Sequence, residues 1–292
     1  MWHDDTTGLV PAIDVDLIRR ALTEDVGRGD ITTEATIPAE AHAHATLVAR
    51  DDGVIAGLPV AIETFRLLDA DLMVEVFAHD GQAVTRGTML AHLDGDARAI
   101  LTAERTALNF LGRLSGIATL AARCARAVEG TRAVVVDTRK TTPGLRALEK
   151  YAVRAGGARN HRAGLDDGIL IKDNHIAIAG GMSAAIGRAR QHAPHLLKIE
   201  AECDTAGQVR EAVESGADAI LLDNMSVEMM REQVTWIREH APHIVIEASG
   251  GIGPDPQRLA QVAATGVDLI SLGALTHSAP NFDVALDFEV HS

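Results

Sequence analysis

The sequence predicts an α/β protein in which repeated βα units surround a parallel sheet, preceded by a smaller antiparallel sheet. After residue 130, short apolar runs recur, each ends in polar or glycine residues, and amphipathic helical patterns separate most of them. Between residues 43 and 94, alternating segments are bounded by Asp-Gly and Arg-Gly turn signals. Because helices would have to cover every strand of the second half, a barrel fits it better than an open sheet.

The first element is a helix, expected over residues 14–25. Asp14 is its N-cap, and apolar side chains such as Ile18 and Leu22 share one face. A turn-rich stretch, VGRGDITTEATIP, follows. The helical period therefore ends before the first predicted strand.

The antiparallel sheet is interrupted by one expected helix, PVAIETFRLLDA. Residues 97–129 also have a helical pattern. Glycines at Gly112 and Gly116 predict a break within it.

The second half contains six apolar runs: AVVVDTRK, GILIKDN, LLKIEAE, AILLDN, IVIEASGG and DLISLG. Their spacing is typical of βα units, and six strands are fewer than a full eightfold barrel contains. In barrels the chemistry lies at the carboxyl ends of the strands. In this sequence those ends carry Arg139, Lys140, Lys172, Glu202, Asp223, Ser249 and Gly273.

Composition narrows the class of protein. The 292 residues suffice for one large or two modest domains, and a net charge of −14 argues against nucleic acid as a general partner. The first thirty residues do not have the pattern of a signal or transit peptide, and no apolar run is long enough to span a membrane. Cys124 and Cys203 lie far apart, which argues against a disulfide framework or a zinc site. The expected location is cytoplasmic.

Residues 132–175 form a basic segment in this acidic chain. They contain nine cations against five acids and three of the four lysines. Arginine offers a planar fork to carboxylates, whereas lysine acts as a point charge that suits phosphate. An anionic small molecule is therefore the expected ligand. The alternative for the cations after the first strand is a solvated strand end.

Acidic residues follow two neighbouring strands. Glu200 and Glu202 are two apart, so on a strand they point the same way, and Asp223 ends the next strand. Acids beside a basic pocket suit Mg²⁺, which prefers one or two carboxylates plus substrate oxygens. The alternative is that they are buried acids paired with cations of the basic segment.

Two glycine-bearing loops close the last strands, ASGGIGP and LGALTHS, and such a pair forms a phosphate site in many barrels. Lys172 has two readings at this stage, a Schiff-base nucleophile or an anion ligand. Arg159 and Arg162 lie on either side of His161 in the sequence, which favours a functional role for this histidine. His42 and His44 share a strand face, but the sequence offers no third ligand near them, so no metal is expected there.

Motifs along nearly the whole chain resemble the quinolinate phosphoribosyltransferase family: EDVGRGDITTEATI, ERTALNFLGRLSGIAT, DTRKTTPGLRALEKYAVRAGGARNHRAGLDDGILIKDNH, IEAE, LLDN, EASGGI and SLGALTHS. The resemblance implies an incomplete TIM-like α/β barrel of parallel strands with an N-terminal α/β sandwich domain. The sandwich would comprise residues 1–115 joined by the tail 277–292, and the catalytic barrel residues 116–276.

The resemblance also implies a reaction. A type II phosphoribosyltransferase of this family converts quinolinate and 5-phosphoribosyl-1-pyrophosphate, with Mg²⁺, into nicotinate mononucleotide, pyrophosphate and CO₂ in de novo NAD biosynthesis. The family's active site lies in a homodimer, so an arginine from the partner subunit is expected in it.

Carried onto this chain, the resemblance implies three groups of residues. The quinolinate-binding group comprises Arg139, His161, Arg162 and Lys172, with Arg105 from the partner subunit, and Thr138 is a further substrate-binding residue. The catalytic and ribose–pyrophosphate group comprises Lys140, Lys172, Glu202 and Asp223, of which Glu202 and Asp223 hold the metal largely through substrate and water. The phosphate group comprises Ser249, Gly250, Gly251, Gly273 and His277.

Four rival functions remain at this stage. A non-catalytic sensor of NAD precursors would have no need for Glu202, Asp223 and a phosphate cradle together. A nicotinate phosphoribosyltransferase would need fewer carboxylate-binding cations. A molybdenum-transport-associated paralogue would have another substrate. A Schiff-base aldolase would use Lys172 as its nucleophile.

Overall fold

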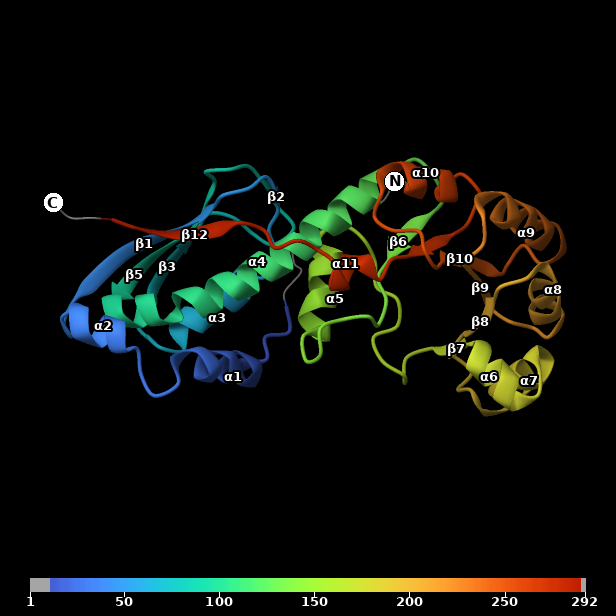
Figure 1. Ribbon diagram of the computed structural model, residues 1–292, viewed down its shortest axis with the longest axis horizontal. Coiled ribbons are helices and arrows are strands. Elements are labelled where there is room, and N and C mark those ends of the chain that lie inside the picture. The colour runs from blue at the N-terminus through green and yellow to red at the C-terminus, as the bar shows by residue number, and fades with distance from the viewer. Residues whose placement is uncertain (1–10, 290–292) are drawn as a thin grey trace. The chain divides into compact units, whose positions relative to one another are not determined.

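The computed structural model of the chain describes residues 11–289 (Figure 1). Its contacts divide these residues into two compact units. The first contains residues 11–122, 142–157 and 278–289, and the second contains residues 123–141 and 158–277. The expected domain boundary at residues 115 and 116 falls inside helix α4 (Ala97–Ala127). Residues 290–292 of the expected tail lie outside the described residues.

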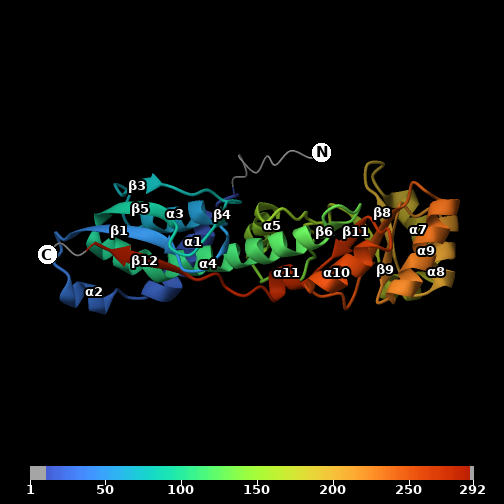
Figure 2. The same ribbon diagram turned by 90° about the horizontal axis from the view of Figure 1, so that it is seen from above.

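The first unit contains the expected antiparallel sheet (Figure 2). Within the described residues it has four strands in the order β12 (Val284–Phe288), β1 (His42–Ala49), β5 (Met89–Asp96) and β3 (Met73–Val76). Two short strands, β2 (Gly53–Val54) and β4 (Ala83–Val84), pair separately. Strand β12 pairs antiparallel with β1, with Leu286 opposite Leu47, so residues late in the sequence complete this sheet.

The predicted first helix is confirmed as α1 (Val15–Val26), and the Asp14 carboxylate accepts hydrogen bonds from the backbone of Asp16 and Leu17. Helix α3 (Leu58–Arg66) is the one predicted to interrupt the sheet. The turn-rich stretch contains a helix that was not predicted, α2 (Ile31–Thr36). Asp30 caps it by accepting from the Thr33 N–H at 3.0 Å.

The predicted break in α4 is wrong, because the helix is continuous from Ala97 to Ala127. Its glycines have a packing role instead. A Cβ on Gly116 would lie 2.0 Å from the carbonyl oxygen of Pro280, and one on Gly112 would lie 2.9 Å from that of Phe282. These glycines therefore allow the segment that leads into β12 to approach the helix backbone closely.

The core of the first unit lies between its sheet and its helices. Leu47, Leu90 and Leu93 from the sheet and Ile100 and Leu111 from α4 are almost completely buried. Helix α5 (Arg146–Ala155) adds a buried polar contact, because the Tyr151 hydroxyl donates to Asp80 at 2.6 Å. Burial of such a phenol is tolerated when its hydroxyl has a partner.

The second unit contains a parallel sheet, and all six predicted strands are confirmed. Within the described chain its order is β6 (Val134–Val136), β11 (Leu269–Ser271), β10 (Val245–Ser249), β9 (Ala219–Asp223), β8 (Ile199–Cys203) and β7 (Ile169–Ile171). The edge strands β6 and β7 are not paired with each other among residues 11–289. The sheet is therefore an incomplete barrel.

The helices of the second unit follow its strands: α6 (Asp173–Ala179), α7 (Met182–His192), α8 (Ala206–Glu214), α9 (Val227–His240), α10 (Pro256–Ala263) and α11 (Ala274–His277). Several of them begin at side-chain caps, such as Thr205 before α8 and Ser226 before α9. These caps place each helix start just after a strand's carboxyl end. Across residues 11–289, no helix is long and apolar enough to cross a membrane.

Candidate active site

A pocket of about 530 Å³ opens at the carboxyl ends of the parallel strands in the second unit. Strands of a parallel sheet present these ends on one side, where ligands of α/β proteins bind. The lining residues are Thr138, Arg139, Lys140, His161, Arg162, Leu170, Lys172, Glu202, Leu221, Asp223, Asn224, Glu247, Ser249, Gly250, Gly251 and Ser271. The structure thus brings together most of the residues that the sequence singled out.

Asp137 fixes the loop that carries the basic lining residues. This side chain is fully buried at the end of β6, where it accepts a hydrogen bond from the His161 N–H at 2.8 Å and one from the Asn160 amide at 2.6 Å. The backbone of Arg159 also bonds to β6, donating to the Val135 carbonyl at 3.0 Å. The loop is therefore tied to the sheet just before Arg162 enters the pocket.

The cations of the pocket are only partly neutralised by the protein. Burial, followed by the charge of Arg139, lowers the pKa of Arg162. The buried Nε of Arg139 has no hydrogen-bond partner among the described residues. Lys172 is paired, since its Nζ lies 2.6 Å from Oε2 of Glu202. Two close guanidinium groups repel each other, so an anion bound between them would be strongly stabilised.

The predicted metal residues both line the pocket. Burial, and then the charge of Asp204, raises the pKa of Asp223, while Lys172 and Lys140 act in the opposite direction. A cation beside Asp223 would relieve this penalty. These two acids do not form a three-ligand cluster of their own within the described chain. This arrangement fits Mg²⁺ held mainly through substrate oxygens and water, with one or two carboxylates.

The glycine-bearing loop after β10 has a backbone that only small residues accept. Gly250 and Gly251 have φ angles of 79° and 61°, and a Cβ on Gly250 would lie 2.3 Å from Oδ1 of Asn224. Asn224 itself has a φ of 53° and donates its N–H to the Ser249 carbonyl at 3.1 Å. Consecutive left-handed residues of this kind form concave N–H surfaces that bind phosphate.

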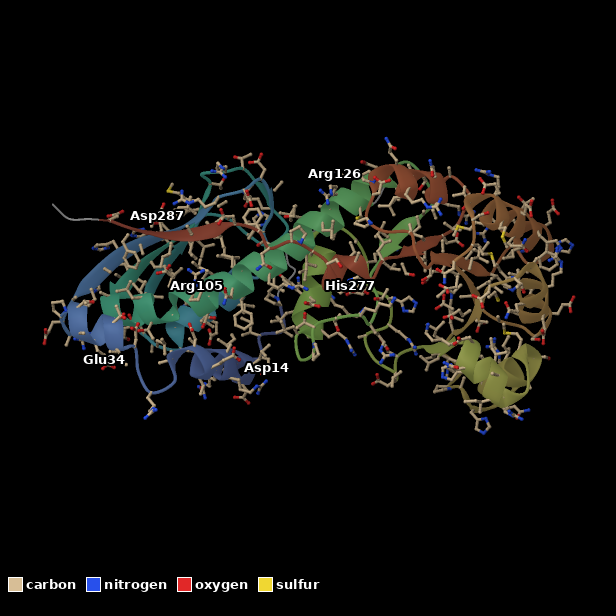
Figure 3. All side chains as sticks on the ribbon, in the orientation of Figure 1. Asp14, Glu34, Arg105, Arg126, His277 and Asp287 are labelled. Atoms are coloured by element: carbon tan, nitrogen blue, oxygen red, sulfur yellow. The ribbon has the colours of Figure 1, made fainter. Side chains whose placement is uncertain are left out.

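Gly273 and His277 are not lining residues, but Gly273 lies next to both Lys140 and His277. A Cβ on Gly273 would be 3.0 Å from Cδ of Lys140 and 3.1 Å from Nε2 of His277. The Thr276 hydroxyl donates to the Lys140 carbonyl at 2.8 Å. The last βα loop therefore supports the lysine that the sequence placed beside the phosphates. Figure 3 labels His277 at the end of α11.

Arg105 belongs to the first unit, where it is exposed on α4 (Figure 3). Its expected role from a partner subunit stays a prediction.

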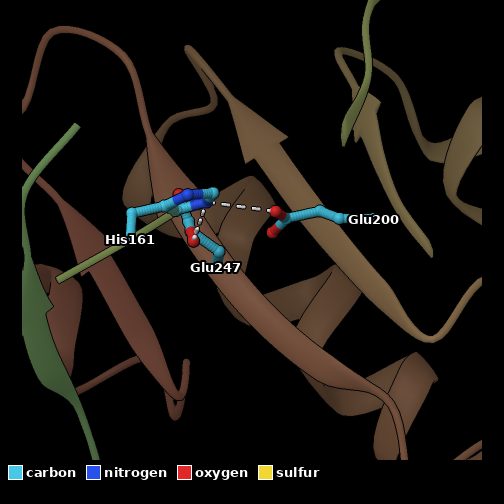
Figure 4. Close-up of side chains that lie close together, drawn as sticks. All are labelled: His161, Glu200 and Glu247. Carbon is cyan, nitrogen blue, oxygen red and sulfur yellow. Dashed lines mark hydrogen bonds and ion pairs between the residues drawn. The ribbon is translucent and has the colours of Figure 1, made fainter. Parts of the chain in front are cut away.

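Sequence reasoning missed Glu247, Asn224, Ser271 and two leucines among the lining residues. Glu247 stands two residues before Ser249, as Glu200 stands two before Glu202, so strand alternation could have identified it. Together with His161, these two glutamates form the donor cluster of Figure 4. His161 Nε2 lies 3.1 Å from Glu200 Oε2 and 3.5 Å from Glu247 Oε2.

His42 and His44 on β1 lie close to an acidic residue that the sequence pattern did not identify. Asp94 on β5 contacts His42 and lies 3.6 Å from Nδ1 of His44. Among residues 11–289, however, the group whose donor atoms lie close enough for one ion is His161, Glu200 and Glu247.

Comparison with known proteins agrees along the whole chain. The family model described as quinolinate phosphoribosyl transferase, C-terminal domain, matches residues 117–287, and the one for its N-terminal domain matches residues 30–115. A probable carboxylating nicotinate-nucleotide pyrophosphorylase of Synechocystis is 44% identical over 281 residues, which cover 96% of this chain and 94% of that protein.

Two further similar proteins carry the same activity name. The carboxylating nicotinate-nucleotide pyrophosphorylase of Mycobacterium leprae is 44% identical, with coverage of 93% of this chain and 96% of the relative. The crystal structure of the nicotinate-nucleotide pyrophosphorylase of Ehrlichia chaffeensis is 37% identical and superposes with a TM-score of 0.89, covering 95% of this chain and 100% of that one. A basic pocket at the end of an incomplete barrel and these matches lead to one conclusion. The chain belongs to the quinolinate phosphoribosyltransferase family.

Proposed function

We propose that the pocket joins quinolinate to 5-phosphoribosyl-1-pyrophosphate and releases nicotinate mononucleotide, pyrophosphate and CO₂. One observation supports this proposal most strongly. Arg139 and Arg162, which are only partly neutralised, line the same pocket as the glycine-bearing loop of Gly250 and Gly251. One substrate is a dicarboxylate, and the other carries a phosphate and a pyrophosphate. The site therefore needs cations and backbone N–H groups for two anions at once.

Arg139 and Arg162 are proposed to bind the carboxylates of quinolinate. A guanidinium can hold a carboxylate through two parallel hydrogen bonds, and the unpartnered Nε of Arg139 supplies one such donor. Gly250 and Gly251 with Ser249 are proposed to hold the 5-phosphate. Lys140 stands between this cradle and the Gly273 loop, where it can neutralise the phosphates.

The chemistry that follows depends mainly on placement. Departure of pyrophosphate leaves positive charge on the ribose, and Glu202 or Asp223 can stabilise that charge at the same end of the pocket. The pyridine nitrogen attacks the anomeric carbon and becomes positively charged. That charge stabilises the electron pair left on the adjacent ring carbon when CO₂ departs. Holding both substrates in line for attack lowers the barrier further.

Mg²⁺ is proposed as the cofactor. Glu202 and Asp223 would hold it, largely through substrate oxygens and water. When bound, it would neutralise the leaving pyrophosphate. The test is Asp223→Asn, which should weaken the response of turnover to Mg²⁺ and leave quinolinate binding nearly intact. Unchanged turnover of this variant at low Mg²⁺ would assign Asp223 to structure.

The rival functions are less well supported. Lys172 is engaged by Glu202, which favours a charged ammonium that binds anions over a neutral Schiff-base nucleophile. Treatment with borohydride in the presence of substrates should leave no adduct on Lys172. A nicotinate phosphoribosyltransferase or a molybdenum-transport-associated paralogue would have less use for both Arg139 and Arg162.

A homodimer with a shared active site is proposed as the active form. It is supported by the exposed position of Arg105 on α4, where a partner subunit can reach it. Arg105→Ala and Lys172→Ala subunits should each be inactive, and mixing them should restore activity because a mixed dimer contains one intact site. Subunit exchange without recovery would place Arg105's action within its own chain.

The decisive assay incubates the protein with 5-phosphoribosyl-1-pyrophosphate, Mg²⁺ and either quinolinate or nicotinate. Nicotinate mononucleotide and CO₂ should form from quinolinate, and nicotinate should be a poor substrate because it lacks one carboxylate. Equal turnover of the two acids would contradict the proposed substrate. The cytoplasmic location expected from the sequence stays a prediction.

A further inference from the structure

Glu247 is an unusual member of an anion-binding pocket. It lies on β10, is only 1% exposed, and lines the pocket with the cations that are proposed to bind quinolinate. Its carboxylate makes no close hydrogen bond among the described residues: its polar neighbours are His161, whose Nε2 lies 3.5 Å from Oε2, and the Ser271 hydroxyl. A buried, ionised carboxylate in this position would be costly by itself and would also repel a dianionic substrate.

Either a metal ion or a proton could neutralise the cluster of His161, Glu200 and Glu247. The hydrogen bonds of His161 decide between them. Its Nδ1 accepts the backbone N–H of Arg162 at 2.7 Å, so Nδ1 carries no hydrogen in the neutral ring. The hydrogen is then on Nε2, which faces both glutamates. A metal ion would need the lone pair of Nε2, so this geometry favours a proton.

The surroundings of Glu247 place that proton on its own carboxyl group. Glu200 on β8 faces it with a like charge and is more exposed, at 9%. Burial, followed by the charge of Glu200, raises the pKa of Glu247 to about 8. His161, the Ser271 hydroxyl from β11 and Lys172 act in the opposite direction. The β9 residue paired with Glu247 is Leu221, which adds no charge.

We propose that Glu247 is a specificity-determining residue that must be a neutral carboxylic acid, kept so by burial beside Glu200, for the pocket to accept the doubly charged quinolinate. This proposal rests on the proposed function and deepens it. Glu247 forms no bond to the substrate in this account. It acts as a positioning residue that orients His161, and in its neutral form it adds no negative charge to the pocket.

The expected pH dependence follows from linkage. Below about pH 8 the acid is neutral and quinolinate binds fully. As pH rises through this value, Glu247 ionises and places a negative charge near the bound dianion. Binding then requires the uptake of one proton, so the Kd for quinolinate should rise by up to about tenfold per pH unit. At about pH 7 no proton should be taken up by Glu247.

The experiment measures quinolinate binding by titration calorimetry at about pH 7 and about pH 9, in buffers of different ionisation enthalpy. The wild-type protein should take up close to one proton per quinolinate at the higher pH and almost none at the lower. Glu247→Gln keeps the neutral shape, so its Kd for quinolinate should be nearly independent of pH between about pH 7 and about pH 9. The matched control, Glu228→Gln on the exposed side of α9, should behave as the wild type.

Binding and turnover by the wild type with no proton uptake at the higher pH would overturn this proposal and leave the proposed function standing. Loss of binding in Glu247→Gln near pH 7 would also overturn it, since an ionised carboxylate would then be required. Absence of any quinolinate binding by the wild type would overturn both proposals. The uptake measurement needs no variant, so it decides the matter even if Glu247→Gln does not fold.

Discussion

Among the described residues, Glu149 in the first unit and Glu247 in the second are both almost completely inaccessible to solvent, and their surroundings differ. Glu149 on α5 in the first unit is bound on every side: Arg113 donates to it at 2.9 Å and 3.2 Å, and the Thr142 backbone and hydroxyl donate at 3.0 Å and 2.8 Å. Glu247 in the second unit makes no close hydrogen bond among the described residues. The carboxylate of Glu149 therefore has a full set of close hydrogen bonds, whereas that of Glu247 does not.

This difference distinguishes structure from function. A buried carboxylate with a full set of donors fixes the chain around it, and in the first unit it ties α5 to α4. Glu247 is buried with only a long contact to His161, at 3.5 Å from Nε2, and this is a cost that folding alone does not explain. Its place in the pocket that is proposed to bind anions supplies a reason.

The largest effect is expected from Arg113→Met. This change leaves the fully buried Glu149 without its cation, which should lower the free energy of unfolding by about 3–5 kcal/mol. Urea unfolding followed by circular dichroism measures it. The control is Arg50→Met, which breaks an exposed pair with Asp287 and should cost about 0–1 kcal/mol. Equal losses in the two variants would show that Glu149 does not depend on Arg113.

A smaller effect is expected from Gly250→Ala in the second unit. The new Cβ would meet the Asn224 side chain and would hold a left-handed φ of 79°, so we expect a cost of about 1–3 kcal/mol. Binding of 5-phosphoribosyl-1-pyrophosphate should weaken at the same time, while quinolinate binding should change little. Gly216→Ala is the control for backbone strain alone, because it has a similar φ of 82° and open space around it.

The effect that is smallest over any single pH unit concerns the dependence of stability on pH. The pKa of Glu247 is raised from an ordinary 4.5 to about 8 in the folded chain, so the folded state retains a proton that the unfolded state loses. Stability is therefore fully present below about pH 4.5 and falls as pH rises toward about 8, by at most about 1.4 kcal/mol per pH unit. Unfolding of Glu247→Gln should lack this decline. An identical pH profile in variant and wild type would mean that Glu247 ionises freely.

Local patterns in the sequence were enough to predict the parallel strands and the polar residues at their carboxyl ends that line the pocket. Each parallel strand is an apolar run that ends at a polar residue, so the positions of Arg139, Lys172 and Asp223 at the carboxyl ends followed from the pattern. Gly112 and Gly116 were misread because a glycine that breaks a helix and one that admits a neighbouring backbone look alike in sequence. Helix α2 was missed because it is only one and a half turns long and depends on the Asp30 cap.

The cluster around His161 could not be predicted for a different reason. Glu200 and Glu247 are far apart in the sequence and become neighbours only through the pairing of β8 and β10 with β9. The tautomer of His161 depends on one backbone N–H in the following residue. Such details are set by register and loop geometry, which apolar periodicity does not encode.

The pairing of β12 with β1 has a consequence for synthesis on the ribosome. Strands β1, β5 and β3 are all made early, yet one edge of β1 must wait until Val284–Phe288 has been translated before it gains its partner. During that interval β1 presents unpaired backbone groups, which invite association with other nascent chains. The second unit has all its strands by Ser271, so it can complete its sheet first. For this chain, the unit that begins earlier is therefore expected to finish folding later.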